Sequence, residues 1–251
     1  MPITVSGRNG NTLRRLFMIE FMLDTANISA ISRLIDTYPI AGVTSNPSIL
    51  KNEGKIDFFP HMKKIREIIG IERSLHIQVI ASDFEGIVKD AETILREIDD
   101  RVYIKIPSTA EGLKAMGHLK SRGVRITATS IYTQFQGLMA VARGVDYLAL
   151  YYNRMENMDI DAEHTIKFLR HVIDRDKLSS KILAASFQNI RQTADALIAG
   201  AHSITAVPKV IDDAFGLSIF QKAVEGFHND WVTIHGDVTL FDLMTEKKKD
   251  F

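Results

Sequence analysis

The chain has 251 residues, 45% of them hydrophobic, and its 31 basic and 31 acidic side chains give a formal net charge of zero. This composition is typical of a soluble globular protein, and it argues against a chain that binds nucleic acid or a membrane surface through excess positive charge. The absence of cysteine excludes disulfides, thiolate metal sites and cysteine nucleophiles, and it suits a reducing, cytoplasmic location. No run of about 18 apolar residues is present, so no transmembrane helix is predicted.

Residues 1–17 differ from the rest of the chain. They contain three arginines, no acidic residue and no apolar stretch long enough for a secretory signal. Met18 directly precedes the first strand-like run and offers a second start site. We interpret residues 1–17 as a disordered N-terminal extension or tag, with a basic regulatory tail as the alternative.

From residue 19 onward, strand-like and helix-like segments alternate. Several of the strand-like segments are apolar throughout, which is typical of a parallel sheet that is covered on both faces. The expected strands are residues 19–24, 41–44, 75–80, 102–106, 125–129, 147–150, 182–185 and 203–205. A helix-sized segment follows each strand, as at residues 27–38, 84–98, 110–121, 132–143, 161–174 and 189–199.

Eight such units in a chain of this length predict an α/β protein, specifically a closed (β/α)8 TIM barrel. No G-x-G-x-x-G turn follows the first strand, so a dinucleotide-binding fold has no support. One more helix is expected at residues 218–231. We therefore predict a single barrel over residues 18–235 that includes the C-terminal helix, followed by a polar tail over residues 236–251.

Polar side chains stand at or near the ends of these strands, where the βα loops of such barrels carry the chemistry. Lys105 is the most informative, because it interrupts an apolar strand between Ile104 and Ile106. Desolvation disfavours the ammonium form of a buried lysine, and a neutral amine can attack a carbonyl to form a Schiff base. The alternative is an edge-strand lysine whose amine reaches solvent, and the local sequence does not choose between the two.

The other strand-end residues each have a structural alternative. Asp24 suits proton transfer or orientation of a lysine, but it also suits capping of the next helix. Asn46 precedes Pro47, a pair that often begins a turn. Arg154 lies near the region where barrels bind phosphate, and its alternative is an ion pair with Glu156.

Taken in order, these motifs resemble the transaldolase family, and most closely the short branch that includes fructose-6-phosphate aldolase. The likeness runs from about residue 18 to 231. The segments that carry it are LDTA at 23–26, AGVTSNPS at 41–48, QVIA at 78–81, VYIKIPSTAEGL at 102–113, TATSIYT at 127–133, NRMEN at 153–157 and KILAASF at 181–187. The resemblance implies a (β/α)8 barrel, a Schiff base on Lys105, no metal and no cofactor.

The resemblance also implies roles for the other residues. Asp24 would transfer a proton, and Thr44 and Asn46 would line the site. Gln78, Thr129 and Tyr151 would hold the catalytic water. Arg154 and Ser186 would bind the phosphate. Without it, Gln78, Thr129 and Tyr151 are each better explained singly as a satisfied buried polar group than as a catalyst, although jointly they could hold a water. Gln78 and Tyr151 match the aldolase branch, since classical transaldolases carry glutamate and phenylalanine there. Gln188 stands where lysine is frequent, which leaves the positive charge near the phosphate to Arg154 and Arg191.

These observations predict a class I aldolase that cleaves and forms fructose 6-phosphate from dihydroxyacetone and glyceraldehyde 3-phosphate. The alternatives are a transaldolase, another Schiff-base aldolase on the same barrel, and a non-catalytic barrel that binds sugar phosphates. A metal-dependent aldolase would need clustered histidines, and the eight present show no ligand-like spacing.

The C-terminal helix carries an apolar stripe, and the resemblance implies that it packs on a neighbouring subunit in a homopentamer or homodecamer. The alternative is that the stripe covers its own barrel. The residues of this stripe are Leu217, Ile219, Phe220, Val224, Phe227 and Trp231.

Overall fold

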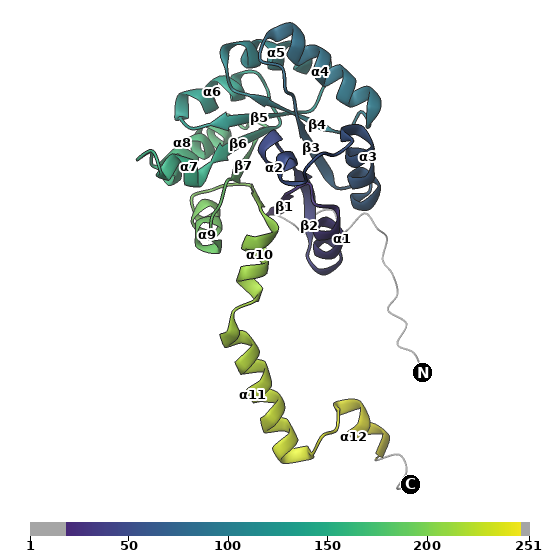
Figure 1. Ribbon diagram of the computed structural model, residues 1–251. Coiled ribbons are helices and arrows are strands. Elements are labelled where there is room, and N and C mark those ends of the chain that lie inside the picture. The colour runs from purple at the N-terminus through teal and green to yellow at the C-terminus, as the bar shows by residue number, and fades with distance from the viewer. Residues whose placement is uncertain (1–18, 247–251) are drawn as a thin grey trace. The chain divides into compact units, whose positions relative to one another are not determined.

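The structure, a computed structural model, describes residues 19–246 (Figure 1). The extension predicted for residues 1–17 lies outside the described residues. Contacts between residues divide the chain into two units, one ending at Val210 and the other beginning at Ile211. The first unit contains the barrel and the second is helical.

Eight parallel strands form a closed barrel in which each strand pairs with the next and β8 pairs with β1. The predicted (β/α)8 barrel is therefore confirmed, with strand bounds that differ from the expected ones by a few residues. The strands are β1 (Glu20–Asp24), β2 (Ile40–Thr44), β3 (Ser74–Gln78), β4 (Tyr103–Pro107), β5 (Ile126–Ile131), β6 (Tyr147–Tyr151), β7 (Lys181–Ala185) and β8 (Ser203–Ala206).

Helices surround the strands of the first unit (Figure 1). They are α1 (Ile28–Thr37), α2 (Pro47–Asn52), α3 (Phe58–Ile69), α4 (Phe84–Glu97), α5 (Ala110–Lys120), α6 (Gln134–Ala142), α7 (Tyr152–Glu156), α8 (Ala162–Arg175) and α9 (Ile190–Ile198). Many begin at a polar residue whose side chain accepts a backbone N–H of the first turn, as Asn27 does for α1 and Thr109 for α5. The short helices α2 and α7 were not predicted, and they directly follow β2 and β6 at the carboxyl end of the barrel.

The barrel interior is apolar at mid-height. Met22, Tyr147, Ala149 and Leu183 form a buried cluster there, with Tyr103 packed against it. The alternation of side chains along a strand places the next inward residues one layer higher, toward the carboxyl end. In β4, the residue two positions after Tyr103 is Lys105, so the lysine lies just above this apolar layer.

A buried histidine belongs to the same interior. His76 is fully buried, its two ring nitrogens lie 2.8 Å from Thr127 Oγ1 and 3.0 Å from Ser74 Oγ, and its ring stacks on Tyr103. Burial, with smaller contributions from nearby positive charges, of which Lys105 is the larger, lowers the pKa of His76 to about 3. The imidazole is therefore neutral at physiological pH.

One glycine fixes how closely a helix approaches the strand that carries Lys105. A Cβ at Gly112 of α5 would lie 1.9 Å from the carbonyl oxygen of Pro107, the last residue of β4. Only glycine allows this approach, so α5 packs directly against the end of that strand.

The second unit contains α11 (Ser218–His235) and α12 (Leu240–Glu246), while α10 (Pro208–Phe215) spans the division between the units. The C-terminal helix predicted at residues 218–231 is confirmed as α11, which continues to His235. The segment predicted as a polar tail contains α12, and Trp231 Nε1 donates a hydrogen bond of 2.7 Å to the Val238 carbonyl between the two helices. None of the side chains of α11 is buried. Within the described part of the chain, we find no helix that combines the length and apolar character needed to cross a bilayer.

Candidate active site

A cavity of about 180 Å³ opens at the carboxyl ends of the strands of the first unit. Its lining includes residues from the ends of β1, β4 and β6 and from the loops and short helices that follow β2, β6 and β7. The predicted site residues among them are Asp24, Asn46, Lys105, Tyr151, Arg154 and Ser186. The structure therefore brings these residues, which span more than 160 positions of the chain, to one place.

Lys105 lies at the base of this cavity and is only 2% exposed. Its Nζ donates a hydrogen bond of 3.2 Å to the carbonyl oxygen of Ser45, which directly follows β2. No ion pair of Lys105 occurs among residues 19–246. A closed barrel has no edge strand, so the alternative of an edge lysine with a solvated amine is wrong.

Asp24 belongs to a chain of hydroxyl contacts. Thr44 Oγ1 donates to Asp24 Oδ1 at 2.7 Å, and the same oxygen lies 2.7 Å from Thr205 Oγ1. Because Thr44 has given its only proton to Asp24, Thr205 is the donor in the second bond. Asp24 does not cap the following helix, since Asn27 is the N-cap of α1, so the capping alternative is wrong.

The carboxyl of Asp24 titrates above its ordinary range. Burial raises the pKa of Asp24, and the positive charge of Lys105, the bond from Thr44 and the charge of Arg154 offset only part of that effect. A carboxyl whose pKa is raised is a stronger base than an ordinary aspartate, which suits it to accept and return a proton during turnover.

Two hydroxyl groups meet between the neighbouring strands β5 and β6. Thr129 Oγ1 and the Tyr151 hydroxyl share a hydrogen bond of 3.0 Å, and both residues are buried. Gln78 is the register partner of Lys105 on the neighbouring strand, but it lines an adjacent cavity of about 180 Å³ with Pro47 and Pro107. Its side-chain oxygen is buried and has no protein partner among the described residues, so it remains available as an acceptor.

Asn46 caps a helix and also lines the cavity. Its Oδ1 accepts a hydrogen bond of 3.0 Å from the backbone N–H of Ile49, which caps α2 directly after β2. Its amide also faces the cavity, where the NH2 group is a free donor for a ligand.

Arg154 stands at the outer part of the same cavity. Its guanidinium lies over the Tyr151 ring, with its carbon 4.8 Å from the ring centre. The alternative ion pair with Glu156 is wrong, because that carboxylate accepts from Gln192 Nε2 at 2.7 Å and no carboxylate pairs with Arg154 among residues 19–246.

The loop after β7 supplies the facing wall. Ser186 has a φ of +67°, a left-handed conformation that a non-glycine residue adopts at some energetic cost. Gln188 also lines the cavity, whereas Arg191 is 88% exposed and lies 3.5 Å from Asp195. Arg154 is therefore the only cation besides Lys105 among the described residues that line this cavity.

Sequence reasoning missed several contributors. Thr205 on β8 completes the contact with Thr44, and the carbonyl of Ser45 holds the lysine. The inward alternation of Ser203 and Thr205 in a short strand was the available signal for the first. A backbone carbonyl leaves no trace in the sequence.

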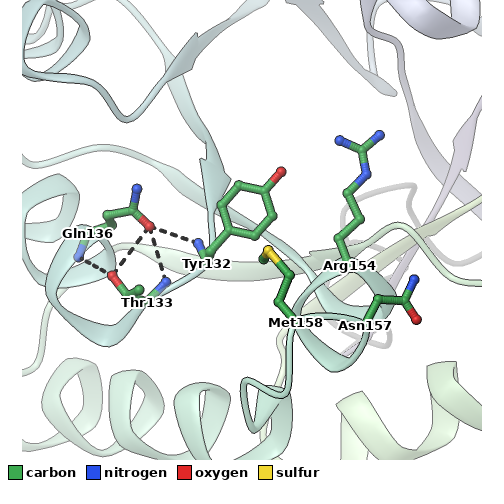
Figure 2. A pocket seen from close by; sticks show the side chains of 6 residues that line it. All are labelled: Tyr132, Thr133, Gln136, Arg154, Asn157 and Met158. Atoms are coloured by element: carbon green, nitrogen blue, oxygen red, sulfur yellow. Dashed lines mark hydrogen bonds between the residues drawn. The ribbon is translucent and has the colours of Figure 1, made fainter.

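A second, larger cavity of about 550 Å³ adjoins the first and shares Arg154 with it. Figure 2 shows the side chains that line it, which come from the start of α6 and from the region of α7. They are Tyr132, Thr133, Gln136, Arg154, Asn157 and Met158.

A closed (β/α)8 barrel with a buried lysine among hydroxyl and carboxyl groups defines an enzyme of the aldolase and transaldolase class. The model of the transaldolase/fructose-6-phosphate aldolase family matches residues 21–237, and the chain belongs to this family. The chain is also 52% identical to a probable fructose-6-phosphate aldolase from Streptococcus pneumoniae. That alignment covers 216 residues, which are 86% of this chain and 97% of the relative.

Proposed function

We propose that the protein is a class I aldolase that cleaves and forms fructose 6-phosphate from dihydroxyacetone and glyceraldehyde 3-phosphate. The observation that carries this proposal is the amine of Lys105, which is buried at the base of a cavity and bonded to a neutral carbonyl. The name and the 52% identity of the relative support the same substrate.

In the proposed reaction, the Lys105 amine attacks the ketone carbon of the sugar, and loss of water with uptake of one proton on nitrogen gives a protonated imine. Asp24 accepts the proton of the hydroxyl on the neighbouring carbon as the carbon–carbon bond breaks and the aldehyde leaves. The bonding electrons remain on the lysine-bound fragment as an enamine. The raised pKa of Asp24 supports this role, because a carboxyl that binds its proton more tightly than usual is a stronger base.

The enamine is then protonated on carbon and hydrolysed. Thr129, Tyr151 and Gln78 would hold the water that gives this proton; the bond between the two hydroxyls and the unpartnered oxygen of Gln78 support this role. Its hydroxide adds to the imine carbon, and collapse of the adduct releases dihydroxyacetone and the free amine. Arg154 and Ser186 would bind the sugar phosphate at the outer part of the cavity.

Borohydride reduction in the presence of dihydroxyacetone tests the proposed nucleophile. We expect a stable adduct that peptide mass spectrometry places on Lys105, and no adduct in Lys105→Ala. Absence of the adduct in the unaltered protein would favour a barrel that only binds sugar phosphates.

The transaldolase alternative differs in the fate of the enamine, which would wait for an acceptor aldehyde. Cleavage of fructose 6-phosphate should therefore be measured with and without erythrose 4-phosphate. Release of dihydroxyacetone without the acceptor is expected, and cleavage that occurs only with the acceptor contradicts the aldolase assignment.

The proposal includes a cytoplasmic enzyme that assembles as a homopentamer or homodecamer. The helix α11 supports an assembly, because Ile219, Phe220, Val224 and Phe227 are each more than half exposed. An exposed apolar helix face of this kind is typical of a contact with another protein surface. Light scattering of the full chain and of a chain that ends at residue 217 tests this, and an unchanged subunit number contradicts the role of α11.

A further inference from the structure

The ring of Tyr151 is held by three groups from different parts of the first unit. Its hydroxyl bonds to Thr129, the guanidinium of Arg154 lies over one ring face, and Tyr132 meets the ring edge-on. The Tyr132 and Tyr151 ring centres are 5.6 Å apart and their planes are inclined by 84°, which is a favourable aromatic arrangement.

These three supports are not equivalent during turnover. Under the proposed function, Arg154 pairs with the phosphate of the substrate, and a guanidinium engaged by a phosphate has less freedom to stay over the ring. The hydroxyl contact to Thr129 is a single hydrogen bond, which by itself does not fix the plane of the ring. The edge-on contact of Tyr132 is apolar, and substrate binding does not compete for it.

The backbone fixes Tyr132 in this place. Ser130 has a φ of +57°, and the register between β5 and β6 shifts between Ala128 and Ile131, so the chain turns sharply just before Tyr132. The N–H of Tyr132 then donates to Gln136 Oε1 at 3.0 Å, within the cap of α6. The left-handed residue and the capped helix start together fix the backbone position of Tyr132.

The ring of Tyr132, rather than its hydroxyl, makes the contact. Figure 2 shows the half-buried Tyr132 side chain as part of the wall of the larger cavity, with Met158 next to it in the lining. Its hydroxyl forms no hydrogen bond with another side chain or backbone group among residues 19–246. Removal of the hydroxyl alone should therefore leave the edge contact intact.

The geometry points to Tyr132 as a positioning residue that holds the Tyr151 hydroxyl where it directs a proton to the enamine. It thereby sets how the enamine on Lys105 divides between two fates. In the first, a water held by Tyr151 gives a proton to the enamine carbon, a C–H bond forms, and the hydroxide adds to the imine carbon, so that dihydroxyacetone and the amine are released. In the second, the same carbon forms a bond to an acceptor aldehyde, whose oxygen takes back the proton that Asp24 accepted during cleavage.

Two variants test this inference, which rests on the proposed function. Tyr132→Phe keeps the ring and Tyr132→Leu removes the edge contact while keeping an apolar side chain. Each full-length variant is incubated with dihydroxyacetone in D2O, and incorporation of deuterium at carbon is followed by NMR, because the exchange requires the enamine to gain and lose a proton. The ratio of dihydroxyacetone release to transfer is then measured with fructose 6-phosphate and erythrose 4-phosphate.

We expect Tyr132→Leu to slow deuterium exchange and dihydroxyacetone release by about tenfold or more, since a positioned proton donor contributes at least that much. Transfer to the acceptor should fall by far less, and Tyr132→Phe should restore the ratio of the unaltered protein. A purely structural role would lower release and transfer together, which would overturn the inference, as would an altered ratio in Tyr132→Phe.

The unaltered protein in the same assay separates this inference from the proposed function. If it releases no dihydroxyacetone without an acceptor, the aldolase assignment fails; if it does and Tyr132→Leu keeps its ratio, the role of Tyr132 fails. Borohydride trapping on Lys105 verifies that the variant is folded, and Tyr132→Met provides the same comparison with a more adaptable side chain if Tyr132→Leu does not fold.

Discussion

Replacement of Gly112 by alanine tests the packing that holds the lysine strand in place. A helix-propensity argument alone predicts that Gly112→Ala stabilises the protein by about 1 kcal/mol. The structure predicts the opposite sign, because the new Cβ would lie 1.9 Å from the Pro107 carbonyl oxygen, a backbone atom that cannot rotate away. Overpacking of a rigid site costs about 1–3 kcal/mol, and an overlap of more than 1 Å belongs at the upper end. The net loss should be about 1–2 kcal/mol.

Gly117→Ala is the matched control, because Gly117 lies in the same helix and its new Cβ would meet only the flexible side chain of Arg143, at 3.2 Å. We expect this variant to be neutral or more stable by up to about 1 kcal/mol. Urea unfolding measures both changes, and the rate of borohydride-trapped adduct should fall only in Gly112→Ala, since Pro107 is two residues from Lys105. If Gly112→Ala is as stable as Gly117→Ala, the close approach of α5 to β4 is not a feature of the protein.

Three further predictions concern the interior and the mouth of the barrel. Thr205→Val removes the donor to Thr44, so the free energy of unfolding should fall by about 1 kcal/mol. The kcat for fructose 6-phosphate cleavage should fall as well. If urea unfolding and steady-state kinetics are both unchanged, the contact between Thr205 and Thr44 is contradicted. His76 has a pKa of about 3 in the folded protein against 6.5 in the unfolded chain. The unfolded state therefore binds more protons as the pH falls, and about 4–5 kcal/mol of stability should be lost as the pH falls from 6.5 to 3. Unfolding curves of His76→Phe should lack this component, and an equally steep loss would refute it. Arg154→Met should raise KM for fructose 6-phosphate by about tenfold or more, with a much smaller change for unphosphorylated fructose; equal changes for both sugars would show that Arg154 does not bind the phosphate.

The fold could be predicted because its signal is local and repeated. Each strand is a short apolar run and each helix begins near a residue such as Asn27 or Thr109 that can cap it. The apolar strands and the eight-fold alternation then leave few architectures that bury them. The division of the chain after Val210, the helix α12 and the short helices α2 and α7 were not predicted, because each has too few residues or too weak a periodicity to stand out.

The site could be predicted only in part, because a side chain's environment depends on contacts that are distant in sequence. The local sequence left Lys105 open between a solvated edge lysine and a buried amine, and the pairing of β1 with β8 decides the matter by removing every edge. The contact of Thr44 with Thr205 spans 161 positions, so neither residue indicates the other in the sequence. Tyr132 is similar: its sequence neighbours predict a helix start, and only the turn at Ser130 brings it to Tyr151.

The partner of Lys105 bears on how the amine becomes reactive. A carboxylate within ion-pair distance would stabilise the ammonium form, which has no lone pair for attack on a carbonyl. In this barrel, Lys105 Nζ donates its hydrogen bond to the neutral carbonyl of Ser45, while Asp24 Oδ1 accepts from Thr44. The hydroxyl chain from Thr205 through Thr44 therefore has a role beyond packing. It donates a hydrogen bond to Asp24, the one carboxylate among the described residues that line the cavity. We therefore expect Thr205→Val to form the borohydride-trapped adduct more slowly even where urea unfolding shows that the variant is still folded. An unchanged rate of adduct formation in the folded variant would contradict this role of the hydroxyl chain.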